Sequence, residues 1–141
     1  VDELLYGEQG IDAVVRQSDF LALCLPSTRE TTNILSRERI FSMKKTAYLV
    51  NIGRGTAIDQ EALVQALRTG AIAGAALDVM TPEPLPEDHA LWQLENCLIT
   101  AHNSGRSRGN QAREVALFGE NLTAYLQHRP MRNVVDFQRG Y

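Results

Sequence analysis

Three polar side chains in this sequence could together act on a carbonyl group. Arg54 lies between Gly53 and Gly55, Glu83 stands between two prolines, and His102 follows an apolar run. The planar fork of an arginine binds a carboxylate and an adjacent carbonyl oxygen, and histidine readily exchanges a proton near neutral pH. A carboxylate beside that histidine would stabilise its imidazolium form. The three residue types therefore predict a carbonyl-reducing site, provided that the fold brings them together.

Each of these side chains also has a plainer structural interpretation. An arginine in a turn is usually only solvated, a histidine at a strand end is more often structural, and a glutamate between prolines can be a surface carboxylate. Asp78, which follows a run rich in glycine and alanine, can be a helix cap or a turn residue. Their joint placement favours the catalytic interpretation, because the carboxyl ends of neighbouring parallel strands open onto one crevice.

Four apolar runs supply the strands that would position these residues. The runs are nearly continuous rather than alternating, which is typical of strands buried on both faces of a parallel sheet. They cover residues 20–25, 47–52, 72–79 and 97–101. Helical patterns lie between them, and the alternation of strands and helices with short links predicts an α/β fold with a parallel sheet and right-handed crossovers.

The helices are indicated by their caps and apolar stripes. Asp59 is expected to cap a helix that ends before Gly70, and Ser36 is expected to cap a shorter one. Between residues 80 and 94, three prolines predict a rigid loop that holds Glu83 in a defined place. The apolar stripe of a long last helix is formed by Val115, Phe118, Leu122, Tyr125 and Leu126.

Composition narrows the class of protein. The 141 residues are the length of one domain, and 44% of them are hydrophobic, enough for a core without metals or cross-links. The net charge is −3 and the basic residues are scattered, so we expect no nucleic-acid and no membrane partner. No run has the length of a membrane span, and the start lacks a signal-peptide pattern. Cys24 and Cys97 lie in apolar runs without metal-ligand spacing, so we expect buried reduced thiols, no metal and a cytoplasmic location.

Several short stretches, in this order and at these spacings, resemble the D-isomer-specific 2-hydroxyacid dehydrogenase family. They are residues 25–31, 43–44, 50–55, 58–63, 74–79 with Glu83-Pro84, and His102 with Gly105. The resemblance covers nearly the whole chain. It implies an oxidoreductase that transfers a hydride between NAD or NADP and a small 2-hydroxy or 2-oxo acid. It also implies that Arg54 binds the carboxylate and carbonyl of the substrate, that His102 is the general acid/base, and that Glu83 is its partner.

The same resemblance implies a set of cofactor contacts, with Asp78 near the nicotinamide amide. The set is Leu25, Pro26, Ile52, Gly53, Arg54, Asp78, His102 and Gly105. Two positions depart from the family pattern, because Ala101 stands where proline usually precedes the catalytic histidine and Met80 stands where an aromatic is common. Residues 135–141 are similar to the ends of some glyoxylate/hydroxypyruvate reductases, which suggests glyoxylate or hydroxypyruvate as substrate.

The family's G-x-G-x-x-G loop is absent from this sequence, as is the acidic residue that binds the adenine ribose. We therefore expect residues 1–141 to be the C-terminal portion of a Rossmann-like dinucleotide-binding domain, truncated before that loop and inactive in isolation. The choice between NAD and NADP stays open. An unpaired sheet edge would make the fragment associate with itself or with the missing piece, and the family resemblance suggests a homodimer.

A binding module is the alternative to an enzyme. The same family includes transcriptional corepressors that use the fold for cofactor-dependent assembly, and these resemble the enzymes at Arg54, Glu83 and His102. The sequence has no basic stripe and no disordered recruitment tail, which favours the enzyme. Turnover of 2-oxo acids, as against cofactor-dependent oligomerisation without turnover, would separate the two.

Overall fold

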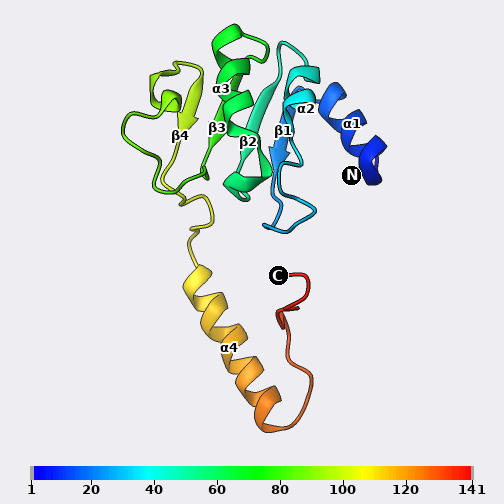
Figure 1. Ribbon diagram of the computed structural model, residues 1–141. Coiled ribbons are helices and arrows are strands. Elements are labelled where there is room, and N and C mark those ends of the chain that lie inside the picture. The colour runs from blue at the N-terminus through cyan, green and yellow to red at the C-terminus, as the bar shows by residue number, and fades with distance from the viewer. Residues whose placement is uncertain (1, 141) are drawn as a thin grey trace. The chain divides into compact units, whose positions relative to one another are not determined.

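A parallel four-stranded sheet forms the centre of the first of two units into which the chain divides (Figure 1). The computed structural model describes residues 2–140, and the first unit ends at Asn103. The second unit contains helix α4 (Asn110–Leu126). The first unit contains, in chain order, α1 (Gly7–Gln17), β1 (Phe20–Leu23), α2 (Arg37–Ser42), β2 (Tyr48–Asn51), the 3-10 helix η1 (Gly55–Ala57), α3 (Gln60–Thr69), β3 (Gly74–Leu77), the 3-10 helix η2 (Ala90–Gln93) and β4 (Cys97–Ile99).

All neighbouring strands of the sheet are parallel and follow the order β1-β2-β3-β4. Their last residues are in register, because Leu23 pairs with Asn51 and Asn51 pairs with Leu77. Leu77 pairs in turn with Ile99. The predicted parallel α/β fold is confirmed, and the segments that follow the four strands all leave from one edge of the sheet.

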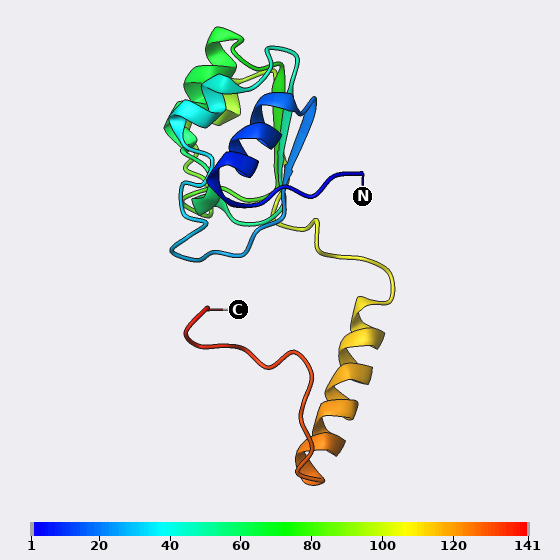
Figure 2. The same cartoon turned by 90° about the vertical axis from the view of Figure 1, so that its right-hand side faces the viewer.

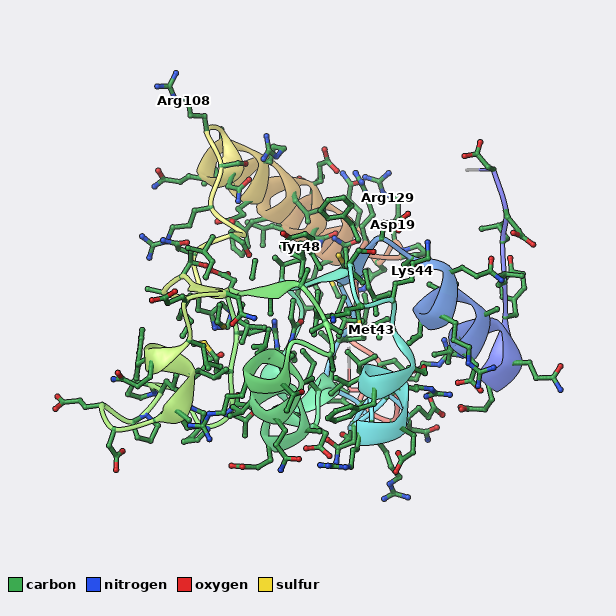
Figure 3. All side chains as sticks on the ribbon, turned by 90° about the horizontal axis from the view of Figure 1, so that it is seen from above. Asp19, Met43, Lys44, Tyr48, Arg108 and Arg129 are labelled. Carbon is green, nitrogen blue, oxygen red and sulfur yellow. The ribbon has the colours of Figure 1, made fainter. Side chains whose placement is uncertain are left out.

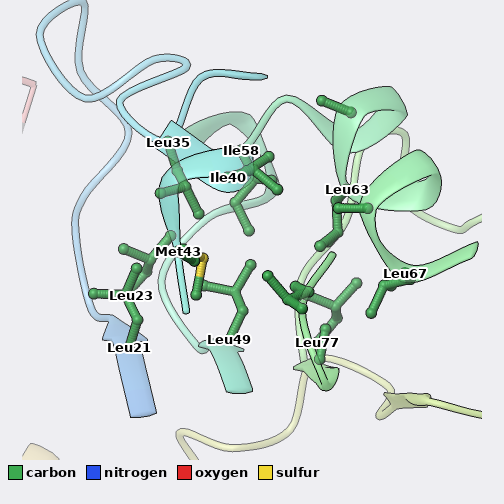
Figure 4. Packing of buried hydrophobic residues seen from close by; sticks show 14 of the residues in the cluster. Leu21, Leu23, Leu35, Ile40, Met43, Leu49, Ile58, Leu63, Leu67 and Leu77 are labelled. Atoms are coloured by element: carbon green, nitrogen blue, oxygen red, sulfur yellow. The ribbon is translucent and has the colours of Figure 1, made fainter. Parts of the chain in front are cut away.

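The hydrophobic core lies between one face of this sheet and the helices α1, α2 and α3, which lie on the same side of it (Figure 2). Leu21, Leu49 and Leu77 contribute to the core from the strands. Ile40 from α2 and Leu63 from α3 meet them from the helical side (Figure 4). The core therefore holds the strand ends, and with them the loops that follow, in fixed positions.

The opposite face of the sheet is open, which corrects the prediction that the strands are buried on both faces. Phe20, Tyr48 and Leu98 are 72%, 47% and 65% exposed, and Tyr48 lies on the side away from α2 and α3 (Figure 3). The rings of Phe20 and Tyr48 stack with centroids 5.6 Å apart. A Cβ on Gly74 would lie 3.0 Å from the Tyr48 ring. The apolar runs are continuous because both faces carry apolar side chains, although no helix within residues 2–103 covers the second face.

Helices α2 and α3 both begin directly after their predicted N-cap residues, and α3 also ends at its predicted glycine. Asp59 accepts a hydrogen bond from the Ala62 N–H at 3.0 Å, and Gly70 ends α3 with a φ of 66°. Ser36 occupies the N-cap position of α2, but its hydroxyl is turned toward the Glu38 carboxylate at 2.7 Å and accepts no helix amide. Ser36 is therefore the N-cap residue of α2, as predicted, but its side chain caps no helix amide because the Glu38 carboxylate takes the hydroxyl.

The second unit consists of α4 and an irregular segment after it. Asn121 joins the two, because its Oδ1 accepts the Arg132 N–H at 2.8 Å and its Nδ2 donates to the Arg132 carbonyl at 2.9 Å. Across residues 2–140, no helix is both long and apolar enough to cross a membrane. The apolar stripe expected on α4 is exposed and consists of Val115, Phe118, Leu122, Tyr125 and Leu126.

A pair of leucine truncations tests where the core lies. Leu63 is fully buried at 0% exposure, so Leu63→Ala should lower the free energy of unfolding of the 141-residue chain by about 2–5 kcal/mol. Leu98→Ala makes the same truncation on the open face and should change it by less than about 0.5 kcal/mol. Urea denaturation followed by circular dichroism measures both values. Equal losses in the two variants would contradict the one-faced core.

Candidate active site

The turn that carries Arg54 is built on a buried asparagine. Asn51 ends β2, and its side chain is fully buried. Its Nδ2 donates to the Arg54 carbonyl at 2.9 Å, and its Oδ1 accepts the Gly53 N–H at 3.1 Å. Arg54 leaves this closed turn as an exposed residue, with one guanidinium nitrogen donating to the Gly53 carbonyl at 2.7 Å. The base of the side chain is thus fixed, while an arginine has further N–H groups to offer a ligand.

Close backbone approaches require the glycines on both sides of Arg54. A Cβ on Gly55 would lie 2.1 Å from the Met80 carbonyl oxygen, and a Cβ on Gly53 would lie 2.6 Å from the Leu25 carbonyl oxygen. Neither position has room for a side chain without moving a backbone. The Arg54 turn is therefore packed between the segment that follows β1 and the segment that follows β3.

Glu83 and His102 are paired through their side chains. Oε2 of Glu83 lies 2.8 Å from Nδ1 of His102, and Oε1 of Glu83 accepts the Met80 N–H at 2.8 Å. The pairing holds one ring nitrogen and directs the other, Nε2, away from the carboxylate. His102 has a φ of 50°, in the left-handed region that non-glycine residues rarely adopt. The two side chains, Glu83 33% exposed and His102 50% exposed, are accessible to a ligand.

The electrostatics of Glu83 link it to Arg54 as well as to His102. Partial burial raises the pKa of Glu83, but the hydrogen bonds from His102 and the Met80 amide, with the charges of His102 and Arg54, outweigh burial and lower the pKa. Glu83 is therefore ionised at neutral pH and can accept a hydrogen bond from Nδ1 of His102. The structure thus brings together the three residues singled out in the sequence.

Asp78 braces the turn that carries His102. It is 3% exposed, and its Oδ1 accepts hydrogen bonds from the Thr100 hydroxyl and from the Asn103 N–H, the latter at 3.0 Å. These donors lie on either side of His102 in the chain. The sequence indicated Asp78 as a cap, a turn residue or a cofactor contact, and missed both Thr100 and Asn51. A polar residue that ends an apolar run was the signal that could have found Asn51.

A cavity of about 480 Å³ opens beside His102. The Trp92 indole N–H donates to the Pro86 carbonyl at 2.9 Å, which fixes one of its walls. The cavity adjoins the Glu83–His102 pair, and Arg54 does not line it. Apolar lining side chains come from the loop after β3, from η2 and from β4 and the segment after it, and include Met80, Leu85, Trp92, Ile99 and Ala101.

The cysteines and acidic groups within residues 2–140 form no metal centre, since no group of three or more His, Cys, Asp and Glu side chains could hold an ion. Cys97 is partly buried, and burial raises its pKa to about 11, so the thiol stays protonated. Cys24 is exposed, which corrects the expectation of a buried thiol. Cys24 directly follows β1 and continues its alternating pattern, in which Phe20 and Ala22 are exposed and the residues between them are buried.

Comparison with known proteins places this geometry in a family. The sequence profile of the D-isomer specific 2-hydroxyacid dehydrogenase, NAD binding domain, matches residues 2–104. The chain belongs to this family. The resemblance carried by the short motifs is thereby confirmed, and so is the Rossmann-like fold class.

Two curated relatives of this chain are named as reductases. It is 42% identical over 117 residues to a glyoxylate reductase of Thermofilum pendens, covering 83% of this chain and 34% of that protein. It is 39% identical over 128 residues to glyoxylate/hydroxypyruvate reductase B of Pectobacterium carotovorum, covering 91% of this chain and 40% of that protein. The chain thus spans between 34% and 40% of the length of these two relatives. The corepressor alternative is not supported by such relatives.

Solved structures of the family share the fold. A D-isomer specific 2-hydroxyacid dehydrogenase from Xanthobacter autotrophicus, in complex with NADPH and MES, superposes with a TM-score of 0.86 at 34% identity, covering 94% of this chain and 54% of that one. A glyoxylate/hydroxypyruvate reductase from Sinorhizobium meliloti, in complex with NADP and sulfate, gives a TM-score of 0.85 at 27% identity, covering 96% and 44%.

The end of the sheet near β1 has features that fit a dinucleotide. Leu25 and Gly53 meet backbone to backbone, so a ligand can approach that edge without meeting a side chain from Gly53. The side chain of Ile52 is 46% exposed there and offers an apolar surface, and Pro26 is also exposed. These features are compatible with the predicted cofactor site. The contacts of Leu25, Pro26, Ile52 and Gly53 with a cofactor stay a prediction.

Gly105 is the predicted cofactor residue that belongs to the second unit. Its carbonyl accepts a hydrogen bond from the Asn110 side-chain amide at 2.6 Å, which ties it to the start of α4. Its contact with the cofactor also stays a prediction.

A single methyl group tests the packing of the Arg54 turn. Gly55→Ala would press a Cβ against the Met80 carbonyl and should lower the free energy of unfolding by about 1–3 kcal/mol. Gly119→Ala is the matched control, because a Cβ there has no neighbour within 4 Å and α4 should gain up to about 1 kcal/mol. Thermal and urea unfolding measure both variants. A Gly55→Ala protein as stable as the parent would show that the turn and the Met80 segment are not in contact.

Proposed function

We propose that the full-length protein reduces small 2-oxo acids to 2-hydroxy acids, with glyoxylate and hydroxypyruvate as substrates and NAD or NADP as cofactor. The observation that carries this proposal is the 2.8 Å contact between His102 Nδ1 and Glu83 Oε2, in a cluster that includes Arg54. The names of the relatives from Thermofilum pendens and Pectobacterium carotovorum support this substrate class.

Arg54 binds the substrate in this proposal. Its side chain starts from a closed turn and is exposed, and the guanidinium fork matches a carboxylate and the adjacent carbonyl oxygen. Two parallel hydrogen bonds of this kind would hold the reacting carbon in one orientation. As negative charge develops on the carbonyl oxygen during reduction, the guanidinium would stabilise it.

His102 delivers the proton. The ionised Glu83 holds Nδ1–H of the imidazolium, so that the transferable proton is on Nε2. This proton passes to the carbonyl oxygen, which becomes the hydroxyl, and the neutral ring keeps its Nδ1–H directed at Glu83. In the oxidation of a 2-hydroxy acid, Nε2 accepts the hydroxyl proton instead.

A nicotinamide dinucleotide would supply the hydride that is added to C2 of the 2-oxo acid. Support for this cofactor comes from the related structures, whose complexes contain NADPH or NADP. We propose Asp78 as the residue nearest the nicotinamide amide. The further contacts that we propose are Leu25, Pro26, Ile52, Gly53, Arg54, His102 and Gly105.

Two substitutions test the proposal in the full-length protein. His102→Gln should lower kcat for glyoxylate by about two to four powers of ten, because the proton donor is lost. Arg54→Lys keeps the charge but loses the fork, and should raise KM for the 2-oxo acid by about tenfold. Arg68→Gln removes an exposed arginine of α3 and serves as control. The assay follows oxidation of NADH and NADPH, and unchanged turnover in the first two variants would refute the assignment.

We also propose that the protein is a cytoplasmic homodimer, or associates through the exposed edge of its sheet at β1. The exposed Phe20 on the edge strand β1 supports this association, and the free Cys24 and Cys97 are typical of a reducing compartment. Light scattering should give twice the monomer mass, and Phe20→Asp should reduce it. A monodisperse monomer, or recovery outside the cytoplasmic fraction, would contradict the corresponding part of the proposal.

A further inference from the structure

The loop that presents Glu83 is held by side chains rather than by its backbone. Within residues 2–140, no backbone-to-backbone hydrogen bond involves residues 80–84, and this segment is neither helix nor strand. Pro82 and Pro84 have no N–H to donate. The position of the Glu83 carboxylate therefore depends on how the remaining polar groups of this loop are bound.

Gln60, the first residue of α3, binds both backbone polar groups of Thr81. Its Nε2 donates to the Thr81 carbonyl at 2.7 Å, and its Oε1 accepts the Thr81 N–H at 3.0 Å. A primary amide is the side chain that can donate and accept at once in this way. The paired bonds clamp the loop onto the start of α3, a helix that is itself anchored in the core by Leu63.

The orientation of this amide is fixed by the two Thr81 contacts. Gln60 Nε2 also lies 3.2 Å from His89 Nε2. The Leu91 N–H donates to His89 Nδ1 at 3.1 Å, so the ring is held by the backbone of η2. His89 therefore packs against the clamp without replacing either bond to Thr81.

Thr81 joins the clamp to the catalytic pair and to the Arg54 turn. It lies between Met80, whose N–H binds Glu83 Oε1, and Glu83 itself, whose Oε2 binds His102. It also borders Gly55, where a Cβ would lie 2.7 Å from the Thr81 hydroxyl oxygen. A displacement of Thr81 would thus move the carboxylate that faces the imidazole.

We propose that Gln60 is a positioning residue for the reaction, an inference that rests on the proposed function. By clamping the backbone of Thr81, it holds Glu83 against His102 and so sets how strongly the imidazolium is stabilised. Gln60 acts through Thr81 and Glu83 and has no direct role in binding substrate or in exchanging a proton. The stretch 58–63 contains Gln60, but the sequence assigned it no role, because its partner Thr81 is 21 residues away.

The test is the pH profile of glyoxylate reduction by the full-length Gln60→Met protein. Methionine has a similar length and helix propensity but can neither donate nor accept these bonds. With Glu83 less firmly held, the imidazolium is less stabilised, so the alkaline fall in kcat should move to lower pH by about 0.5 unit. At neutral pH, kcat should fall about 3- to 10-fold, while KM changes less than about twofold because Arg54 still binds substrate.

Two further variants keep this test decisive. Gln60→Ala also removes the clamp, and alanine is the best helix former. It should shift the profile in the same direction, so the test stands even if Gln60→Met folds poorly. Gln65→Met makes the same change at an exposed position of α3 and should leave the profile and kcat unchanged. Thermal unfolding shows that each variant is folded. Parental profiles in both Gln60 variants would overturn the inference.

A double-mutant cycle shows whether Gln60 acts through Glu83. Glu83→Gln should move the alkaline fall further than Gln60→Met does, because the carboxylate charge is lost. In the Glu83→Gln background, Gln60→Met should cause no additional shift, whereas a full additional shift would overturn the inference alone. Activity that survives His102→Gln would instead refute the proposed function, and this inference with it.

Discussion

The site depends on how closely backbone segments can approach one another at the carboxyl edge of the sheet. Gly53 and Gly55 allow the Arg54 turn to pack against the segments that follow β1 and β3, at distances that a Cβ would prevent. Neighbouring parallel strands bring their loops to one edge, but they do not by themselves bring them into contact. Because Gly53 and Gly55 have no side chains, the loops after three adjacent strands can pack against one another.

Two buried polar side chains stabilise the turns at this edge. Asn51 satisfies the backbone of the Arg54 turn, and Asp78 accepts donors from both sides of His102. Across the described residues 2–140, no buried side-chain nitrogen or oxygen lacks a partner. Because an unsatisfied buried amide or carboxylate costs free energy, each of these side chains favours the one turn conformation that satisfies it. Arg54 and His102 can then remain exposed.

Local signals predicted the strands, the α3 caps and the grouping of Arg54, Glu83 and His102. Apolar runs, an Asp–Gly capping pattern and glycine-flanked turns are each encoded within a few residues. Whether a strand is covered on its second face is a tertiary property, so the exposure of Phe20 and Leu98 was not visible in an apolar run. The contact of Gln60 with Thr81 joins segments that are distant in sequence. The bracing by Asp78 depends on the path of β4, and the partner of the Ser36 hydroxyl depends on which carboxylate it meets.

The loop around Glu83 can leave the sheet without breaking a single bond of the strand ladder, since residues 80–84 take no part in backbone pairing within the part of the chain that the structure describes. Opening this loop breaks only side-chain contacts, and such local openings need less free energy than global unfolding. We therefore expect warming to disturb the arrangement of Glu83 before it unfolds the sheet and its helices.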